Sequence, residues 1–239
     1  MNIVISGYGR MGKEVEAVAL KRGHQILAKI DRTEEWEQLD AEWPKTDVVI
    51  DFSQPEVVID NLNRCFSAGI PIVTGTTGWD KQLEEVSKAC NVKKGTLFFA
   101  PNFSIGVNIF FLANQQLAKL MAGVEGYSTT IEETHHIHKL DAPSGTAIKT
   151  AEGIIGQNPH FEKWVNQPSM KNSELSIISN REGEVTGTHE VIYDSEVDTL
   201  TLKHEAKNRS GFALGAVLAA EFVQGRQGVF TMDDLLENV

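Results

Sequence analysis

The densest group of chemically competent side chains lies in one stretch, IEETHHIHKLDAPSGTA, which covers residues 131–147. It holds three histidines, one lysine and three carboxylates, and it runs into a Pro-Ser-Gly turn. Titratable groups at this density can form a metal site, a substrate pocket or a solvated polar loop. The choice among these depends on the elements that position the stretch.

The histidine spacing argues against a metal site. His135, His136 and His138 lack the i, i+4 spacing of a helical zinc pair, and no cysteine stands nearby. On an extended chain His135 and His136 point to opposite sides, whereas His136 and His138 share a face. Because two ligands do not close a metal site, we expect no metal here.

An acid–base role fits the same residues. A hydride added to a polarised double bond leaves a centre that must be protonated, and His135 or Lys139 can supply that proton. Nearby cations also pair with carboxylate substrates. Gly145 and Thr146 open a predicted helix whose free N–H groups bind carboxylates, and Asp141 is a candidate for capping or orienting the loop. A solvated polar loop is the structural alternative.

A glycine-rich loop near the start of the chain predicts a dinucleotide site. The sequence GYGRMG fits G-x-G-x-x-G between a buried strand and a helix; its residues are Gly7, Tyr8, Gly9, Arg10, Met11 and Gly12. Such glycines permit a tight turn, close approach to a pyrophosphate and close helix–strand packing. Asp31 follows the second predicted strand, where an acid can hold an adenosine ribose, and Arg32 beside it can pair with a 2′-phosphate. We therefore expect NADH or NADPH; a plain glycine turn is the alternative.

Strand and helix alternate through the first hundred residues. This alternation is typical of a parallel sheet with helices on both faces. Ligands gather outside the carboxyl ends of such strands, where this chain carries two further polar loops. These loops contain Gly75, Thr76 and Thr77 after the fourth strand, and Ala100, Pro101, Asn102 and Phe103 after the fifth. Ordinary turn chemistry is their structural alternative.

The pattern changes near Asn102. The spacing of apolar residues predicts a helix over 105–121, a strand over 127–136 and a helix from Ser144. We expect a loop over 157–173, three or four antiparallel strands over 174–206, and two C-terminal helices. The fold class is thus α/β: an N-terminal Rossmann-like doubly wound parallel sheet and a second α+β domain built on a mostly antiparallel sheet. We place the dinucleotide-binding domain at 1–103, completed by 210–239, and the substrate-binding and oligomerisation domain at 104–209.

Composition narrows the class of protein. The net charge of −11, from 33 acidic against 22 basic residues, argues against a nucleic-acid partner or an anionic membrane surface. Cys65 and Cys90 belong to no CxxC pair, so we expect buried, reduced thiols. The N-terminus has no basic leader followed by a long apolar run. These features predict a cytoplasmic protein.

The stretch from Glu133 to Ala147 is similar to the signature E-x-H-H-x-x-K-x-D-A-P-S-G-T-A of the dihydrodipicolinate reductase family. The blocks GRMG, IDFSQPE, GTTG, APNFSIGVN and HEAKNRSGFALGA resemble other blocks of that family, in the same order over nearly the whole chain. Two departures stand out. The glycine loop is one residue shorter than the commoner family form, and the connection TEEWEQLDAEWPK between the second and third strands is abbreviated.

The resemblance implies NAD(P)H-dependent reduction of a cyclic imine dicarboxylate on the diaminopimelate route to lysine. It implies proton donors at His135 and Lys139, and holders of the substrate carboxylates at His136, Gly145 and Thr146. It implies a homotetramer formed through the sheet of the second domain. It further implies cofactor contacts from residues 7–12, 31–32, 75–77 and 100–103, and a role for Arg209 where the chain returns to the first domain. The proton-bearing groups are then expected to face the nicotinamide across a cleft.

Three other functions are alternatives to this one. A nucleotide-sensing regulator needs no paired proton donors, so the acid–base cluster argues against it. Another two-domain NAD(P)-dependent reductase, of the aspartate or homoserine type, uses other catalytic blocks, and neither Cys65 nor Cys90 sits in a catalytic setting. A zinc hydrolase that used the histidines would contain metal on elemental analysis.

Overall fold

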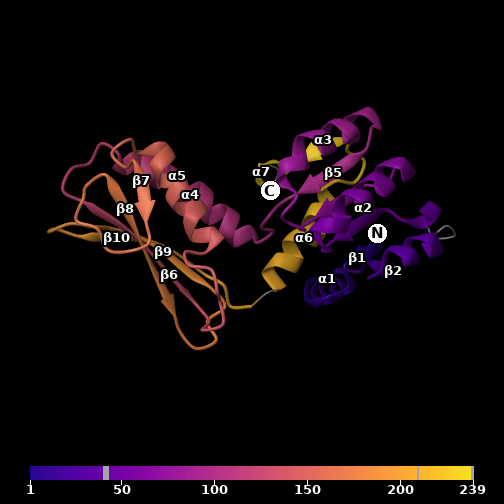
Figure 1. Ribbon diagram of the computed structural model, residues 1–239, viewed down its shortest axis with the longest axis horizontal. Helices are drawn as coiled ribbons and strands as arrows, with labels where there is room; N and C mark the ends of the chain where they lie inside the picture. The colour runs from indigo at the N-terminus through magenta and orange to yellow at the C-terminus, as the bar shows by residue number, and fades with distance from the viewer. Residues whose placement is uncertain (40–42, 209, 238–239) are drawn as a thin grey trace. The chain divides into compact units, whose positions relative to one another are not determined.

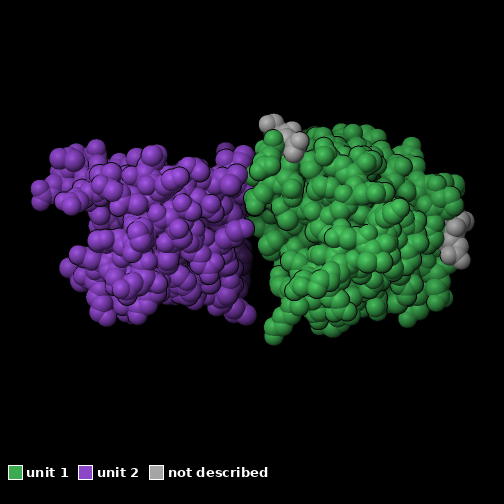
Figure 2. All heavy atoms as spheres, turned by 90° about the horizontal axis from the view of Figure 1, so that it is seen from above, with its two compact units in different colours: residues 1–105, 210–239 green, residues 106–209 purple. Residues whose placement is uncertain are grey.

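The computed structural model describes residues 1–39, 43–208 and 210–237. The chain divides into two compact units, coloured separately in Figure 2. Unit 1 comprises Met1–Ile105 and Ser210–Val239, and unit 2 comprises Gly106–Arg209. The boundaries predicted from the sequence, after residues 103 and 209, lie beside these.

Unit 1 is built on a parallel six-stranded sheet of order β11-β5-β4-β3-β1-β2. The strands are β1 (Asn2–Ser6), β2 (Gln25–Ile30), β3 (Val48–Asp51), β4 (Ile72–Thr74), β5 (Thr96–Phe99) and β11 (Gly228–Phe230). The first strand, β1, lies inside the sheet beside the edge strand β2, and the order reverses between β1 and β3, the switch point at which such sheets bind ligands. The predicted doubly wound sheet is confirmed. The three residues of β11 are too few to show a strand pattern, so the sixth strand was missed.

Both faces of this sheet are covered, because successive strand residues point to opposite sides. Ile3 and Ile5 pack with one core, whereas Val4 packs with the other. The first core lies under α1 (Arg10–Lys21), α6 (Ser210–Phe222) and α7 (Met232–Leu236). The second lies under α2 (Pro55–Ala68) and α3 (Leu83–Val92), on the other side of the sheet (Figure 1). A short 3-10 helix, Asp80–Gln82, precedes α3.

The abbreviated connection between β2 and β3 contains two 3-10 helices, Thr33–Leu39 and Trp43–Lys45. Trp36 is buried at 3% exposure, and its ring stacks on that of Trp43 with centroids 5.7 Å apart. Trp36 and Trp43 both pack into the core under α2 and α3. Two aromatic side chains of this short connection thus contribute to the core under α2 and α3.

Unit 2 contains a five-stranded sheet of order β10-β9-β6-β8-β7. Its strands are β6 (Ser128–His135), β7 (Lys163–Val165), β8 (Glu174–Arg181), β9 (Thr188–Asp194) and β10 (Thr199–Glu205). β9 pairs antiparallel with β6 and β10, but β8 pairs parallel with β6 and β7. The sheet is therefore mixed rather than mostly antiparallel, because the helix over 145–157 returns the chain before β7 and the segment 166–173 returns it again before β8. β7 lies inside the segment predicted as a loop.

Two helices cover one face of this sheet. They are α4 (Ile105–Met121), which confirms the predicted helix, and α5 (Gly145–Gln157). Their apolar residues pack against the buried side of β6, β8 and β9, including Ile131, Ile177 and Tyr193. β6 therefore has one buried, helix-covered side and one more exposed polar side.

Cys65 and Cys90 are free thiols buried in unit 1, as predicted. Burial raises the pKa of Cys90 to about 11, so this thiol stays protonated. Across the described part of the chain, no helix has the length and apolarity that a bilayer crossing requires.

Candidate active site

Strand β6 carries the centre of the site. Side chains alternate along a strand, so Glu133 and His135 point toward the helices while Glu132 and Thr134 point to the other face. Glu133 is fully buried and His135 is 8% exposed. The alternation visible in the sequence thus places a carboxylate and an imidazole together, inside the protein.

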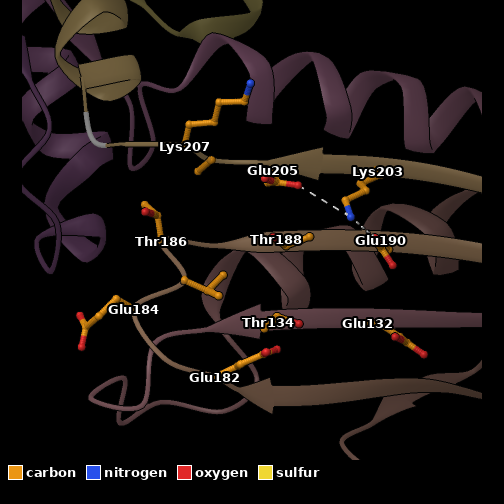
Figure 3. A pocket seen from close by; sticks show the side chains of 12 residues that line it. Glu132, Thr134, Glu182, Glu184, Thr186, Thr188, Glu190, Lys203, Glu205 and Lys207 are labelled. Carbon is orange, nitrogen blue, oxygen red and sulfur yellow. Dashed lines mark ion pairs between the residues drawn. The ribbon is translucent and has the colours of Figure 1, made fainter.

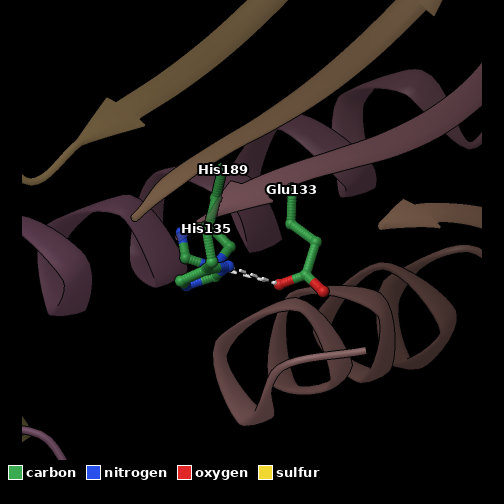
Figure 4. Close-up of side chains that lie close together, drawn as sticks. All are labelled: Glu133, His135 and His189. Atoms are coloured by element: carbon green, nitrogen blue, oxygen red, sulfur yellow. Dashed lines mark ion pairs between the residues drawn. The ribbon is translucent and has the colours of Figure 1, made fainter. Parts of the chain in front are cut away.

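A second histidine joins them from β9. In the antiparallel register Glu133 stands opposite His189, which is 4% exposed. The Nδ1 atom of His135 lies 3.1 Å from Oε2 of Glu133, and Nε2 of His189 lies 3.8 Å from the same oxygen. Figure 4 shows both imidazoles directed at one side of the carboxylate. The two rings are 5.1 Å apart between centroids.

The other carboxylate oxygen holds the start of α5. Oε1 of Glu133 accepts the Ser144 backbone N–H at 3.0 Å. The Ser144 hydroxyl accepts the Ala147 N–H at 3.2 Å and lies 3.2 Å from Nε2 of His189. Ser144, and not Asp141, is therefore the N-cap of α5. Glu133 links the His135 imidazole to the helix N-terminus at which Gly145 and Thr146 stand.

Burial and neighbouring charges determine which side chains of this cluster are ionised. Burial alone would raise the pKa of Glu133, but contacts with His135 and Ser144 outweigh it and hold that pKa well below its ordinary value. Burial, followed by the neighbouring charge of His135, lowers the pKa of His189 to about 4. At neutral pH the cluster therefore holds an ionised carboxylate and a neutral His189 beside the His135 ring.

Lys139 lies in the loop that connects β6 to α5. Its Nζ donates to Oδ1 and Oδ2 of Asp141 at 2.8 and 2.9 Å, and this contact lowers the pKa of Asp141. Arg181, at the end of β8, donates to the Asp141 carbonyl at 2.6 Å and approaches Oε1 of Glu133 at 3.4 Å. Asp141 thus orients Lys139, and Arg181 ties their loop to the buried carboxylate.

The other two histidines of the motif lie outside the cluster. His136 follows the last residue of β6 and is partly exposed, with its ring 6.1 Å from that of the exposed His138. His138 has its Nε2 atom 3.3 Å from Glu184. His136 is therefore accessible to a ligand, whereas His138 pairs with a surface acid.

The three buried side chains lie close enough together to hold a cation, which the spacing of the histidines in the sequence does not predict. One ligand atom from each of Glu133, His135 and His189 lies within 4.8 Å of the others. A cation there would face the Arg181 guanidinium, 3.4 Å from the same carboxylate. We interpret the three side chains as an acid–base cluster, because Arg181 and the Ser144 N–H already balance Glu133.

The glycine loop fits a pyrophosphate. Gly7 has φ +81°, and a Cβ there would lie 2.2 Å from the Phe52 carbonyl oxygen. A Cβ on Gly12 would lie 2.5 Å from the Gly7 oxygen, whereas one on Gly9 would meet nothing within 4 Å. Gly7 and Gly12 are thus required by close packing, and Gly9 leaves open space at the N-terminus of α1. An anion can approach the backbone there.

The residues expected at the adenosine ribose stand at the end of β2 and are exposed. Oδ1 of Asp31 accepts the Tyr8 N–H at 2.7 Å, so this acid also holds the glycine loop. Oε2 of Glu35 accepts the N–H groups of Asp31 and Arg32 at 2.7 and 3.2 Å. The side chain of Arg32 is exposed beside the acid.

The remaining cofactor candidates differ in which of their atoms a ligand can reach. Ala100 and Phe103 are each 2% exposed and belong to the core, so only their backbone atoms can touch a ligand. Thr76 is buried and donates its hydroxyl to Asp51 at 2.7 Å. Exposed or partly exposed candidates are Arg10, Met11, Gly75, Thr77, Pro101 and Asn102. Because the strands are parallel, all these loops lie at the carboxyl edge of one sheet.

A polar hollow occupies the opposite face of the unit 2 sheet (Figure 3). Glu132, Thr134 and Glu205 line it, and Lys203 there pairs with Glu190 at 2.7 Å. None of the residues predicted for the active site lines this hollow. The catalytic candidates therefore belong to the helix-covered side of the sheet.

Sequence reasoning missed His189, Arg181, the central place of Glu133 and the capping role of Ser144. His189 had a readable signal, because it shares the buried row of β9 with Val191 and Tyr193. Nothing local pointed to Arg181, whose contacts depend on the parallel pairing of β6 and β8. Arg209 lies outside the described residues.

Two family models match this chain. Residues 1–103 match "Dihydrodipicolinate reductase, N-terminus", and residues 106–236 match "Dihydrodipicolinate reductase, C-terminus". The 4-hydroxy-tetrahydrodipicolinate reductase of Christiangramia forsetii is 44% identical over 100% of this chain and 99% of its own. That of Rickettsia bellii is 34% identical over 100% of this chain and 96% of its own.

Solved structures agree with these relatives. A dihydrodipicolinate reductase from Paenisporosarcina sp. TG-14, with dipicolinate bound, is 26% identical with a TM-score of 0.77, covering 97% of each chain. An engineered D-amino acid dehydrogenase bound to NADP+ is 14% identical with a TM-score of 0.54, covering 99% of this chain and 95% of its own. The second likeness extends to the fold alone.

Proposed function

The chain belongs to the dihydrodipicolinate reductase family, and we propose that it is itself a 4-hydroxy-tetrahydrodipicolinate reductase. The observation that supports this most directly is the buried Glu133–His135 pair, joined through Ser144 to the N-terminus of α5. It places a proton-bearing imidazole near a site suited to a carboxylate. The substrate is the cyclic hydroxylated dicarboxylate, and the product is tetrahydrodipicolinate.

The reaction loses water from the ring and reduces the resulting conjugated imine with one hydride and one proton. When bound, NADH or NADPH supplies the hydride. The open space at Gly9 and the exposed Asp31 and Arg32 support a dinucleotide at the carboxyl edge of the unit 1 sheet. Asp31 suits the free ribose of NADH and Arg32 the 2′-phosphate of NADPH, so we propose that the enzyme accepts both.

His135 and Lys139 handle the protons. The Glu133 carboxylate, 3.1 Å from Nδ1, favours a proton on that nitrogen and leaves Nε2 of His135 to exchange protons with the substrate. Asp141 holds the Lys139 ammonium in the loop before α5. Lys139 is the second proton donor in this proposal, and its charge also attracts the dicarboxylate.

The substrate carboxylates are held by His136 and by the first turn of α5. Gly145 is exposed and Thr146 partly exposed, and both follow the Ser144 cap. Their backbone N–H groups lie where a helix leaves donors without intrahelical partners. Donors fixed by the helix orient the ring without reorganisation during the reaction.

Calorimetric titration tests the two ligand sites in turn. NADH and NADPH are titrated first, and pyridine-2,6-dicarboxylate, a planar mimic of the substrate, is then added. We expect both dinucleotides and the mimic to bind, and nucleotide oxidation to require the substrate. A protein that bound dinucleotide but showed no turnover would instead be a nucleotide-sensing regulator.

His135→Gln tests the chemistry itself. The variant should lower kcat by about 100-fold or more while changing KM far less, because a general acid acts in the transition state. Asp31→Ala serves as the comparison, since it should weaken NADH more than NADPH and leave proton transfer intact. An unchanged kcat in His135→Gln would remove this residue from the mechanism.

We further propose a homotetramer assembled through the unit 2 sheet, located in the cytoplasm. The open polar face of that sheet and the two free thiols support these assignments. Sedimentation velocity tests the assembly, and a monomer at micromolar concentration would contradict it.

A further inference from the structure

A second buried carboxylate lies in unit 1, at the carboxyl ends of the central strands. Asp51 is the last residue of β3, and it is fully buried at 0% exposure. Its hydrogen-bond partners among the described residues are neutral hydroxyl and amide groups. A buried carboxylate is costly unless several donors replace its lost water. The fold therefore surrounds the buried Asp51 with donors that offset the cost of its burial.

Hydroxyl donors reach Asp51 from the two strands that flank β3. Ser6, the last residue of β1, donates to Oδ2 at 2.7 Å. Thr74, the last residue of β4, donates to Oδ1 at 3.2 Å, and Thr76 in the following loop donates to Oδ1 at 2.7 Å. One carboxylate thus gathers the ends of three adjacent parallel strands.

Two more donors come from the segment after β3. The Ser53 hydroxyl donates to Oδ1 at 3.0 Å, and Asn61 on α2 donates to Oδ2 at 3.0 Å. Asn61 also reaches the Ser6 hydroxyl at 3.2 Å. This second contact orients Ser6 toward Asp51, so the network is cross-linked and not a set of separate pairs.

The donors stand where the two predicted cofactor loops leave the sheet. Ser6 immediately precedes Gly7, and the Phe52 N–H donates to the Ser6 carbonyl at 2.8 Å. Thr74 and Thr76 flank Gly75, whose N–H donates to the Asp51 carbonyl at 2.9 Å. Any shift of the carboxylate therefore moves the starting points of both loops.

We propose that Asp51 is a positioning residue of the dinucleotide site. Its carboxylate holds the glycine loop and the Gly75–Thr77 loop at the spacing that NADH or NADPH requires. The inference rests on the proposed function and deepens it, since Asp51 acts through the loops without touching the cofactor. An asparagine in its place would turn an NH2 group toward donors that need an acceptor.

Asp51→Asn is tested by direct titration of NADH and of NADPH, without substrate. We expect dissociation constants about tenfold higher or more for both nucleotides, because buried donors left without an acceptor force the loops apart. Titration needs no turnover. A wild-type protein that binds nucleotide but reduces nothing would therefore overturn the proposed function while leaving the Asp51 test intact.

Ser6→Ala and Thr96→Val complete the design. Ser6→Ala removes one donor from a well-packed strand, so it decides the question if Asp51→Asn does not fold; we expect binding to weaken several-fold. Thr96→Val is the matched control, because the buried Thr96 hydroxyl donates to the Arg226 carbonyl at 2.5 Å, at the amino end of β5. It should lower the melting temperature and leave nucleotide affinity unchanged.

Two outcomes would overturn the proposal. One is unchanged nucleotide affinity in a folded Asp51→Asn or Ser6→Ala protein. The other is a Thr96→Val protein that loses as much affinity for the same loss of melting temperature, because Asp51 would then contribute only to general stability. A loss of affinity confined to the two variants at the carboxyl edge supports positioning.

Discussion

At the scale of single residues, Glu133 performs two tasks with its two oxygens. One oxygen lies beside the His135 imidazole and the other accepts the backbone N–H that begins α5. The nearest comparable residue is Glu132, whose side chain points to the opposite face of the same strand and lines the polar hollow. Glu132 and Glu133 are adjacent but point to opposite faces of β6. Substituting each in turn therefore shows whether an effect depends on which face carries the glutamate.

Glu133→Gln should lower kcat at least ~10-fold, because an uncharged amide no longer favours the proton on Nδ1 of His135. Glu132→Gln is the control and should leave kcat unchanged. Equal losses in the two variants would show that the effect arises from the strand as a whole.

His189 makes stability depend on pH. It is neutral in the folded protein down to a pKa of about 4, against an ordinary value of 6.5, and it faces Glu133, His135, His204 and Lys139. Between these values the unfolded chain binds a proton that the folded protein does not, so stability falls as pH falls. The loss is ~3 kcal/mol at most.

The measurement is urea unfolding between pH 7 and pH 4. His189→Asn keeps a donor near Ser144 but cannot titrate, so its free energy of unfolding should fall less than that of the wild type. Asn in place of the exposed His138 should leave the wild-type pH dependence intact. The lowered pKa of Glu133 reduces the stability of the folded protein only below the ordinary pKa of 4.5. The loss of stability between pH 6.5 and pH 4.5 can therefore be assigned to His189 without a contribution from Glu133.

At the scale of elements, the glycines of the glycine loop have different roles: two are required by packing, and one leaves room for a ligand. A Cβ on Gly7 or Gly12 would collide with neighbouring backbone atoms, whereas a Cβ on Gly9 would meet nothing within 4 Å. Gly9→Ala should therefore leave the melting temperature nearly unchanged yet raise the dissociation constants of NADH and NADPH about tenfold, because the methyl group fills the pyrophosphate position.

Gly156→Ala is the matched control for Gly9→Ala. Gly156 also meets nothing within 4 Å and lies in α5, so the substitution should stabilise the helix slightly and leave nucleotide binding alone. If Gly9→Ala bound both nucleotides normally, the pyrophosphate would have to lie elsewhere on the sheet edge.

At the scale of the whole molecule, the last segment of the chain completes the fold of unit 1. Helix α6 returns after unit 2 and packs with α1 in the core beneath the sheet. A Cβ on Gly215 would lie 1.7 Å from the carbonyl oxygen of Phe103, a residue of one predicted cofactor loop. The N-terminal residues alone therefore lack two helices, α6 and α7, and the sixth strand of their sheet.

Gly215→Ala should destabilise the protein by about 1–3 kcal/mol, because a methyl group is forced into a well-packed contact. It should also weaken NADPH binding, since Phe103 must move. Gly211→Ala, on the same helix but with nothing within 4 Å, should not destabilise the protein and should leave nucleotide binding unchanged. Thermal unfolding and nucleotide titration of the two variants check this, and a Gly215→Ala protein with wild-type stability would contradict it.

The sequence by itself determined the local features. Alternating strands and helices in the first hundred residues, the glycine loop and the helix over 105–121 were all readable, and the structure contains them. Each depends on a repeat of 2 or 3.6 residues, or on a turn that needs glycine. Such signals lie within a few neighbouring residues.

Only the tertiary structure decided which distant residues meet. His189 reaches Glu133 through the register of β9 on β6, and Arg181 reaches the Lys139 loop through the parallel pairing of β8. The five donors around Asp51 come from the ends of two strands, from the segments that follow β3 and β4, and from helix α2. Strand register is set by hydrogen bonds and packing between segments far apart in the chain, and no local pattern encodes it.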